Sequence, residues 1–275
     1  MNTPSFPLSV ITAAVVVLAS GGNAHAQYEI NHTIAQAGIP NAGGLDLLND
    51  APGYPVSLNR SGSYKLTSNL NVPAGSVGVV INATGVTLDL NGYKIVGPGV
   101  CTRNDTTYFV GCAPATLDAS GTIGVQFMKG GNVLRNGAIQ GFATGVLYKG
   151  SDHLEDLIVS HNMRGISSPQ HHGGARTVIR SVRAELNAYS GFSANDAMIQ
   201  GSTAASNGGH GFFLGRSMVL DSFAFQNLLH GFDGAAANGA PGLVLGRNVS
   251  AQNKGGDFDG ATSMGGNVST NGQVY

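Results

Sequence analysis

The sequence predicts an all-β fold, a single-stranded parallel β-helix in which short strands wind into stacked coils. The first observation is a repeat of about 20 residues, in which an Asn is followed three or four residues later by a Gly and usually an aromatic residue. Coils of a solenoid bury their apolar faces only by stacking on one another, and a fixed period of this size is typical of them. The second observation is that short apolar runs alternate with Gly and Asn without a helical period, which indicates strands. The repeats start at Asn162, Asn187, Asn207, Asn227 and Asn253.

The first 26 residues (1–26) are predicted to be a secretory signal peptide. They contain an apolar stretch from Leu8 to Ala19 and end in a small-x-small triplet, Ala24 to Ala26. The stretch is short against the roughly 20 apolar residues that span a bilayer, so cleavage before Gln27 is preferred to a membrane anchor. We therefore expect a secreted or periplasmic protein whose mature chain has no membrane span.

Residues 27–56 are expected to form an N-terminal cap, and residues 57–275 to form the β-helix domain. The first open edge of a solenoid has to be covered, and this segment contains a helical stretch around His32 to Ala37. No capping sequence follows the last coil. That coil is therefore expected either to face water or to meet another chain, which would be self-association through its edge.

Charge excludes two classes of partner. The chain has 14 basic and 15 acidic residues and a net charge of −1. It lacks the basic surface that nucleic acids or anionic lipids require. Gly is abundant, at 42 residues, which suits tight turns between short strands.

Cys101 and Cys112 are the two cysteines of the chain. A signal peptide directs the chain to compartments where disulfides persist, so we expect a disulfide that closes a protruding loop between them. The alternative, a metal pair, is weaker because two thiolates without nearby His make an incomplete site.

The segment from Gly62 to Cys101 resembles the opening coils of a known group of proteins. Its runs GSYKLTSNL and VTLDLNGYKI look like those of secreted bacterial β-helix proteins in the pectate-lyase-like superfamily. The resemblance covers residues from Ala51 to the end and implies a right-handed parallel β-helix. Polysaccharide lyases, uronate epimerases and glycoside hydrolases share this superfamily with members of no known chemistry, so the resemblance does not specify an activity.

The repeat also assigns neighbours across coils. Asn side chains at identical turns are predicted to form an amide ladder, which is a structural role. Residues at the same offset in successive coils lie about 4.8 Å apart, and opposite charges there stabilise a sheet. Three such pairs are predicted: Glu155 with Arg180, Asp196 with Arg216, and Asp221 with Arg247.

Two histidines, His210 and His230, occupy the same turn position in successive coils. Gly209-His210-Gly211 is similar to the Gly-His-Gly element of polygalacturonases, in which the His assists hydrolysis by separated carboxylates. The Asn-Thr-Asp, Asp-Asp and Arg-Ile-Lys elements of those enzymes are absent, which argues against pectin hydrolysis. Both histidines are therefore interpreted first as decoration of a polar turn.

The repeat is interrupted twice, early in the coils that begin at Gly165 and Gly231, which are five or six residues longer than their neighbours. Both insertions should lie on one side of the solenoid, with two regular coils between them. Loops on one face of a solenoid commonly bind ligands, although these insertions also fit plain surface loops. The candidate cleft consists of His171, His172, Arg176, Asp196 and Arg216.

No metal site or cofactor is expected. Adjacent residues such as His171 and His172 point in opposite directions on an extended segment, and no third ligand is evident. Calcium requires six or more oxygen ligands, and the carboxylates of SDHLED (151–156) and GGDFDG (255–260) are interpreted as solvated turns.

Two functions of different classes remain, and the sequence leaves open whether the protein is an enzyme. The first is a secreted β-helix that presents a binding surface to a glycan or cell-envelope partner. The absence of Trp counts against it. The alternative is a carbohydrate-active enzyme, a metal-independent uronate polysaccharide lyase or C5-epimerase, which needs a positioned base and a group that stabilises the developing charge.

Overall fold

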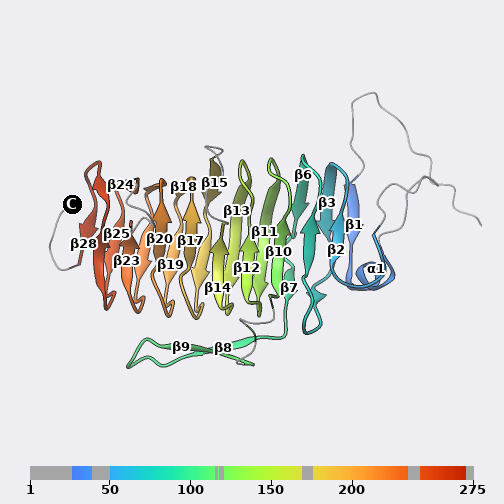
Figure 1. The fold of residues 1–275 in the computed structure, drawn as a ribbon, viewed down its shortest axis with the longest axis horizontal. Coiled ribbons are helices and arrows are strands. Elements are labelled where there is room, and N and C mark those ends of the chain that lie inside the picture. The colour runs from blue at the N-terminus through green and yellow to red at the C-terminus, as the bar shows by residue number, and fades with distance from the viewer. Residues whose placement is uncertain are drawn as a thin grey trace, which may run out of the picture.

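A computed structural model shows the chain as an elongated stack of parallel coils (Figure 1). The structure describes residues 27–38, 50–114, 117, 121–168, 176–234 and 242–270. Within them, two parallel sheets run the length of the stack and a separate antiparallel hairpin lies beside it. The predicted all-β parallel β-helix is therefore confirmed.

One strand of each coil contributes to a nine-stranded parallel sheet. Its strands, in order along the stack, are β2 (Val56–Leu58), β5 (Val79–Ile81), β10 (Ile123–Phe127), β12 (Thr144–Leu147), β14 (Arg164–Ser167), β17 (Phe192–Asn195), β20 (Phe212–Gly215), β23 (His230–Asp233) and β26 (Gly256–Asp259).

The remaining strands form the long sheet, which has 17 strands. They are β1 (Gln27–Ile30), β3 (Gly62–Leu66), β4 (Leu70–Asn71), β6 (Val86–Asp89), β7 (Lys94–Val96), β11 (Val133–Gln140), β13 (His153–Ser160), β15 (Thr177–Arg180), β16 (Arg183–Glu185), β18 (Ala197–Gln200), β19 (Thr203–Ala205), β21 (Met218–Leu220), β22 (Phe223–Phe225), β24 (Val244–Gly246), β25 (Val249–Ala251), β27 (Thr262–Ser263) and β28 (Val268–Ser269). Most coils contribute two strands here, separated by a corner, whereas β11 and β13 continue through that corner and pair with both strands of a neighbouring coil.

Helix α1 (His32–Ala37) lies at the first end of the stack, beyond β1, as the helical stretch in the sequence indicated (Figure 1). The Asn31 side chain accepts a hydrogen bond from the Ile34 amide and caps the helix. β1 itself pairs in parallel with β3. No helix in the described ranges is long and apolar enough to cross a membrane. The predicted signal peptide, residues 1–26, lies outside the described residues.

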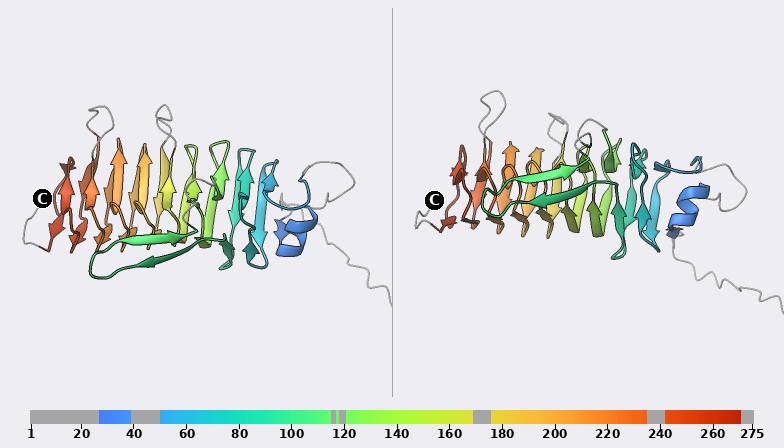
Figure 2. Two further views of the ribbon diagram at one scale, coloured as in Figure 1. Left: turned by 60° about the horizontal axis from the view of Figure 1, so that its bottom comes forward. Right: turned by 90° about the horizontal axis from the view of Figure 1, so that it is seen from below.

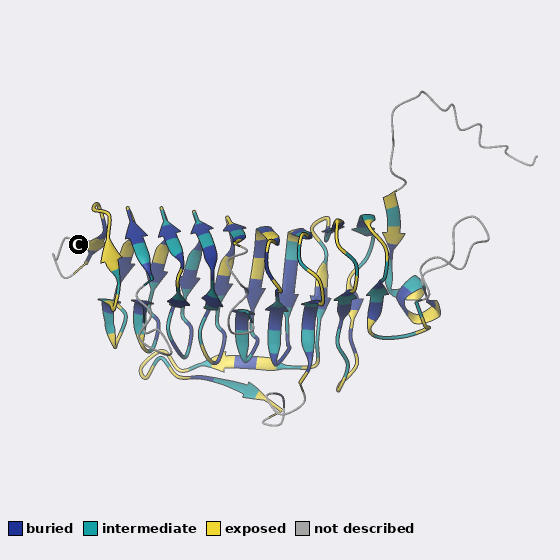
Figure 3. Ribbon diagram, turned by 45° about the horizontal axis from the view of Figure 1, so that its top comes forward, coloured by how far each residue is buried: buried dark blue, intermediate teal, exposed yellow. Residues whose placement is uncertain are grey.

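Buried residues recur from coil to coil (Figure 3), and their side chains form one apolar core. Phe192, Phe212 and Phe232 are fully buried, and their rings stack with centroids 4.6 and 4.7 Å apart. The position before each aromatic residue has no space for a side chain and therefore requires Gly. A Cβ on Gly211 would lie 2.6 Å from the Gly231 carbonyl oxygen and 2.8 Å from Nδ2 of Asn227. The Gly-aromatic pair of the repeat is thus a packing unit.

The predicted Asn ladder is present and buried. Nδ2 of Asn187 donates to Oδ1 of Asn207 at 3.0 Å, and Nδ2 of Asn207 donates to Oδ1 of Asn227 at 2.9 Å. The residue before each of these Asn residues has left-handed backbone, as at Ser206 and Gln226, with φ of 56° and 53°. The Asn side chain can therefore turn inward and bond to its neighbours because the preceding residue makes the corner.

A hairpin of β8 (Val100–Arg103) and β9 (Val110–Ala113) leaves the stack and runs along its side (Figure 2). The predicted disulfide Cys101–Cys112 joins its strands. The expectation of a protruding loop is wrong, because the hairpin packs on later coils. Cys101, Cys112 and Val110 form a small apolar cluster with Met163 and Ala188.

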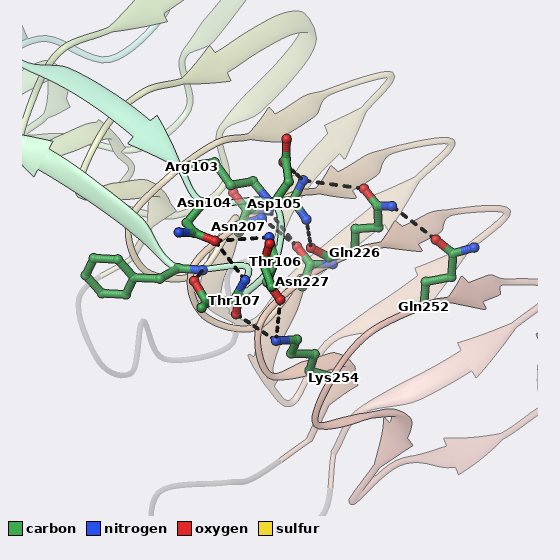
Figure 4. Close-up of polar contacts among 11 residues, drawn as sticks. Arg103, Asn104, Asp105, Thr106, Thr107, Asn207, Gln226, Asn227, Gln252 and Lys254 are labelled. Atoms are coloured by element: carbon green, nitrogen blue, oxygen red, sulfur yellow. Dashed lines mark hydrogen bonds and ion pairs between the residues drawn. The ribbon is translucent and has the colours of Figure 1, made fainter.

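The hairpin tip is attached to coils far along the chain (Figure 4). Nζ of Lys254 donates to the carbonyl oxygens of Thr106 and Thr107 at 3.1 and 2.9 Å. Arg103 donates to the side chain and the carbonyl of Gln226, at 3.5 and 3.4 Å. The hairpin therefore straps several coils together.

Removing the Lys254 ammonium should loosen the hairpin tip without unfolding the solenoid. In Lys254→Met, we expect amide hydrogen exchange of residues 104–109 to accelerate several-fold, while the free energy of unfolding changes by less than about 1 kcal/mol, because the contact is exposed. Lys94→Met, an exposed lysine on β7, is the control and should leave this exchange unchanged. Unchanged exchange in Lys254→Met would show that the tip is held by other contacts.

Candidate functional site

Both interruptions of the repeat fall at the same corner of the coil, between a strand of the nine-stranded sheet and the next strand of the long sheet. The first separates β14 from β15, and the second separates β23 from β24. Residues 169–175 and 235–241 lie outside the described residues, and His171 and His172 with them. The structure therefore informs on Arg176, Asp196 and Arg216 of the candidate cleft.

These three residues occupy one column on successive coils. The residues that directly follow them, Thr177, Ala197 and Ser217, are neighbours across coils. Thr177 pairs with Ala197 in the sheet, and the Ala197 amide donates a hydrogen bond to Oγ of Ser217. Gly242 continues the column, and a Cβ there would lie 2.6 Å from Cα of Arg216. The backbone at Gly242, the first described residue after the second interruption, therefore packs directly against the backbone of Arg216.

A pocket of about 220 Å³ opens at this column, and we call it the corner pocket. It is lined by Arg176, Arg216, Ser217, Met218, Gly242 and Val244. Arg176 follows the first interruption directly and Gly242 the second. The two arginines, two coils or about 10 Å apart, therefore line one pocket between the interruptions.

Asp196 forms the predicted ion pair with Arg216. Nη2 of Arg216 lies 2.7 Å from Oδ2 of Asp196, and the Asp196 side chain is 9% exposed. A carboxylate held in this way is not free to approach a substrate proton, because it is nearly buried and its Oδ2 is engaged by the Arg216 guanidinium. Arg176 is exposed and the Arg216 side chain is 41% exposed, so both guanidinium groups are accessible to an anionic ligand at the pocket.

The other predicted ion pairs are confirmed in part. Nε of Arg247 lies 2.7 Å from Oδ1 of Asp221, as the repeat predicted. Glu155 is in register with Arg180, but it forms an ion pair, at 3.8 Å, with Arg135 of the preceding coil. The register was predicted correctly, but the Glu155 side chain contacts the arginine of the preceding coil instead of the one in the next coil.

His210 and His230 converge on a third residue, Asp233 of β23. Oδ2 of Asp233 lies 3.1 Å from Nδ1 of His210 and 3.4 Å from Nδ1 of His230. The Asp233 side chain is 6% exposed, and those of His210 and His230 are 18% and 28% exposed. We call these three residues the histidine cluster; it is more than the turn decoration that the sequence suggested.

Burial lowers the pKa of His210, and its neighbour His230 adds to the lowering, whereas the carboxylate of Asp233 opposes it. The imidazole is therefore neutral near pH 7. Nδ1 of His210 is buried and has no hydrogen-bond partner among the described residues, because its approach to Asp233 lacks hydrogen-bond geometry. Asp233 was not predicted as part of this cluster, because it lies outside the turn. Its position three residues after His230 could have indicated the contact.

In each acidic segment one carboxylate is buried, contrary to the expectation of a solvated turn, whereas Asp156 and Asp259 are exposed as expected. Asp152 is buried and accepts backbone hydrogen bonds from Asn132, Lys149 and Gly150 at 2.9–3.0 Å. Asp257 is also buried and bonds to Ser250, Asn253 and Ser269. These carboxylates satisfy turn amides and the end of the Asn ladder, so their role is structural.

A larger pocket, of about 460 Å³, lies at the first end of the stack. It is lined by His32, Gln36, Pro52, Gly53, Tyr54, Asn71, Val72 and Pro73. Nδ1 of His32 and the Tyr54 hydroxyl are 3.1 Å apart and hydrogen-bonded, and burial raises the pKa of Tyr54 to about 12. Because its polar groups already bond to one another, this pocket is a weaker candidate than the corner pocket.

Comparison of the sequence with protein-family models and with curated proteins gives no match. Three solved structures resemble the fold. Pectate lyase Pel9A has a TM-score of 0.53 at 16% identity, over 87% of this chain and 67% of the lyase. The Dettilon tailspike protein gp208 has a TM-score of 0.46 at 14% identity, over 72% of this chain, which spans 40% of the tailspike. The periplasmic alginate epimerase AlgG has a TM-score of 0.40 at 10% identity, over 86% and 83% of the two chains.

At these identities the comparison establishes the fold. The parallel register of both sheets and the match to Pel9A over most of the chain agree with the expectation drawn from the opening coils. The chain is a right-handed parallel β-helix protein with a pectate-lyase-like fold.

Proposed function

We propose that this protein binds an acidic polysaccharide, a polymer that contains uronate, outside the cytoplasm. The observation that carries the proposal is the corner pocket, in which Arg176 and Arg216 line one cavity between the two interruptions of the repeat. A guanidinium is always charged and presents a planar fork of donors that matches a carboxylate.

The arrangement favours an extended ligand over a small one. A pocket of about 220 Å³ is smaller than the roughly 300–1,000 Å³ of ordinary small-molecule sites, so it fits one sugar unit of a longer chain. Other units would lie along the side of the stack. The fold supports this view, because Pel9A, which shares it, is by name a pectate lyase.

The disulfide supports a location outside the cytoplasm, since disulfides persist in oxidising compartments. Secretion itself, and cleavage before Gln27, stay predictions, which N-terminal sequencing of the exported protein would check.

Binding to acidic polymers is the test. In affinity electrophoresis, we expect the protein to be retarded by polygalacturonate or alginate and not by neutral dextran. Arg176→Ala should weaken the retardation about ten-fold, because a charge-assisted hydrogen bond contributes roughly 1.5–3 kcal/mol. Arg247→Ala removes an exposed arginine at another corner and should bind like the unchanged protein. Equal retardation by dextran, or no effect of Arg176→Ala, would contradict the proposal.

The same polymers test the alternative, a metal-independent lyase or C5-epimerase. A lyase creates a conjugated double bond that absorbs in the ultraviolet. We favour binding because Asp196, the carboxylate beside the corner pocket, is nearly buried and engaged by Arg216, and so is not placed to take a substrate proton.

A further inference from the structure

We propose that His210, His230 and Asp233 form a site for one divalent transition-metal ion of the zinc type. This site is separate from the corner pocket, because His210 precedes β20 and Arg216 follows it, so that the strand separates them. His210 lies two residues before β20, His230 is the first residue of β23, and Asp233 is its last.

The distances from the carboxylate oxygen to the two imidazole nitrogens are close to those between the ligands of a tetrahedral ion. Zinc binds nitrogen and oxygen ligands at about 2.0–2.2 Å, so two ligands of a tetrahedral ion are about 3.3–3.5 Å apart. The two Nδ1 atoms lie 3.1 and 3.4 Å from Oδ2 of Asp233, and all three atoms lie within 4.8 Å of one another. Small rotations of the rings would bring the three atoms around one centre.

An unpartnered atom is the second observation. Nδ1 of His210 is buried and makes no hydrogen bond among the described residues, although Oδ2 of Asp233 is 3.1 Å away. A buried nitrogen without a partner is costly and calls for an explanation. A metal ion held between this nitrogen and the carboxylate would supply the partner that Nδ1 of His210 lacks.

The ligands sit on rigid structure. The carbonyl of His210 accepts from the Gly191 amide at 3.1 Å, and that of His230 accepts from the Gly211 amide at 2.9 Å. Asp233 is in register with Phe213, whose ring lies 5.1 Å from the His210 ring. Backbone pairing therefore fixes the two histidines one coil apart, which preorganises the site.

Two imidazole nitrogens and one carboxylate oxygen suit zinc, copper or nickel, and they do not suit calcium. Asp259 adds a further carboxylate at the edge, with Oδ2 3.9 Å from Nδ1 of His230 and its side chain 61% exposed. A fourth ligand, either water or Asp259, can approach from the solvent side. Three protein ligands with an accessible fourth position are typical of sites that exchange ligands.

The test is calorimetric titration of the full mature chain, stripped of metal by a chelator, with zinc chloride. We expect one zinc per chain, no competition from calcium, and an affinity lowered more than about 100-fold in His210→Ala and in His230→Ala, since losing even an outer partner of a ligand reduces affinity 10–100-fold. His153→Ala, an exposed histidine on β13, is the matched control and should bind as the unchanged protein does.

A second measurement guards against loss by misfolding. Circular dichroism of the metal-free variants should match that of the unchanged protein, and His230→Gln, at the more exposed position, should retain the fold while losing zinc. Cobalt bound in place of zinc should give visible absorption bands that His230→Gln abolishes. No zinc binding by the unchanged protein, or stoichiometric binding that persists in folded His210→Ala, would overturn the proposal.

Discussion

Asn207→Ala should lower the free energy of unfolding by about 4 kcal/mol. Oδ1 of Asn207 accepts from the backbone amide and from Nδ2 of Asn187, at 3.1 and 3.0 Å, and the side chain is fully buried. Alanine would leave both donors without this acceptor, and each buried, unsatisfied donor costs about 1–3 kcal/mol. Nδ2 of Asn207 also donates to the Ala184 carbonyl at 3.0 Å, which adds to the loss.

Urea unfolding followed by circular dichroism measures this change. Gln252→Ala is the control. Oε1 of Gln252 accepts a hydrogen bond from Nε2 of Gln226 at 3.1 Å, in an equivalent cross-coil contact that is exposed to water. We expect this substitution to cost less than about 1 kcal/mol, since water replaces the lost partner. Equal losses in the two variants would mean that the buried ladder contributes no more than a surface amide pair.

Phe212→Ala should destabilise the protein by about 3–5 kcal/mol, the range for removing a buried aromatic side chain. Its ring is fully buried between Phe192 and Phe232, at centroid distances of 4.6 and 4.7 Å. The coil spacing is fixed by backbone hydrogen bonds, so the neighbouring rings cannot close the gap and a cavity stays. Thermal or urea unfolding measures the loss.

Phe258→Ala tests whether the position within the stack matters. Phe258 is partly exposed, and its ring lies 5.4 Å from that of Phe232. We expect about half the loss seen at Phe212, because the Phe258 side chain is less buried and removes less apolar area from water. A larger loss at Phe258 than at Phe212 would contradict the packing argument.

The periodic features were predictable because one coil sets the position of the next. The repeat placed Asp196 beside Arg216 and Asp221 beside Arg247, and both pairs are present. It also predicted the Asn ladder, in which the residue before each Asn has left-handed backbone. Identical offsets meet across coils, since hydrogen-bonded strands repeat at a constant spacing.

Features that break the period could not be predicted in this way. The hairpin that contains Cys101 and Cys112 follows no repeat, and its docking on Met163 and Ala188 depends on shape and apolar contact between distant segments. Asp233 approaches His210 across coils and from a different offset, so counting from the turns did not connect them. For the candidate cleft, the sequence placed Asp196 beside Arg216 and assigned Arg176 to the first insertion, whereas the alignment of all three in one column was found in the structure. His171 and His172 stay predictions.

The attachment of the β8–β9 hairpin tip to Lys254 limits how many coils this protein can have. Solenoids usually tolerate the gain or loss of a whole repeat, because each coil contacts only its neighbours. Here Lys254 must meet the carbonyls of Thr106 and Thr107, which are 148 and 147 residues away in sequence. Removing one coil between them would shift Lys254 by about 4.8 Å relative to the tip. The length of the hairpin and the number of coils beneath it therefore have to change together.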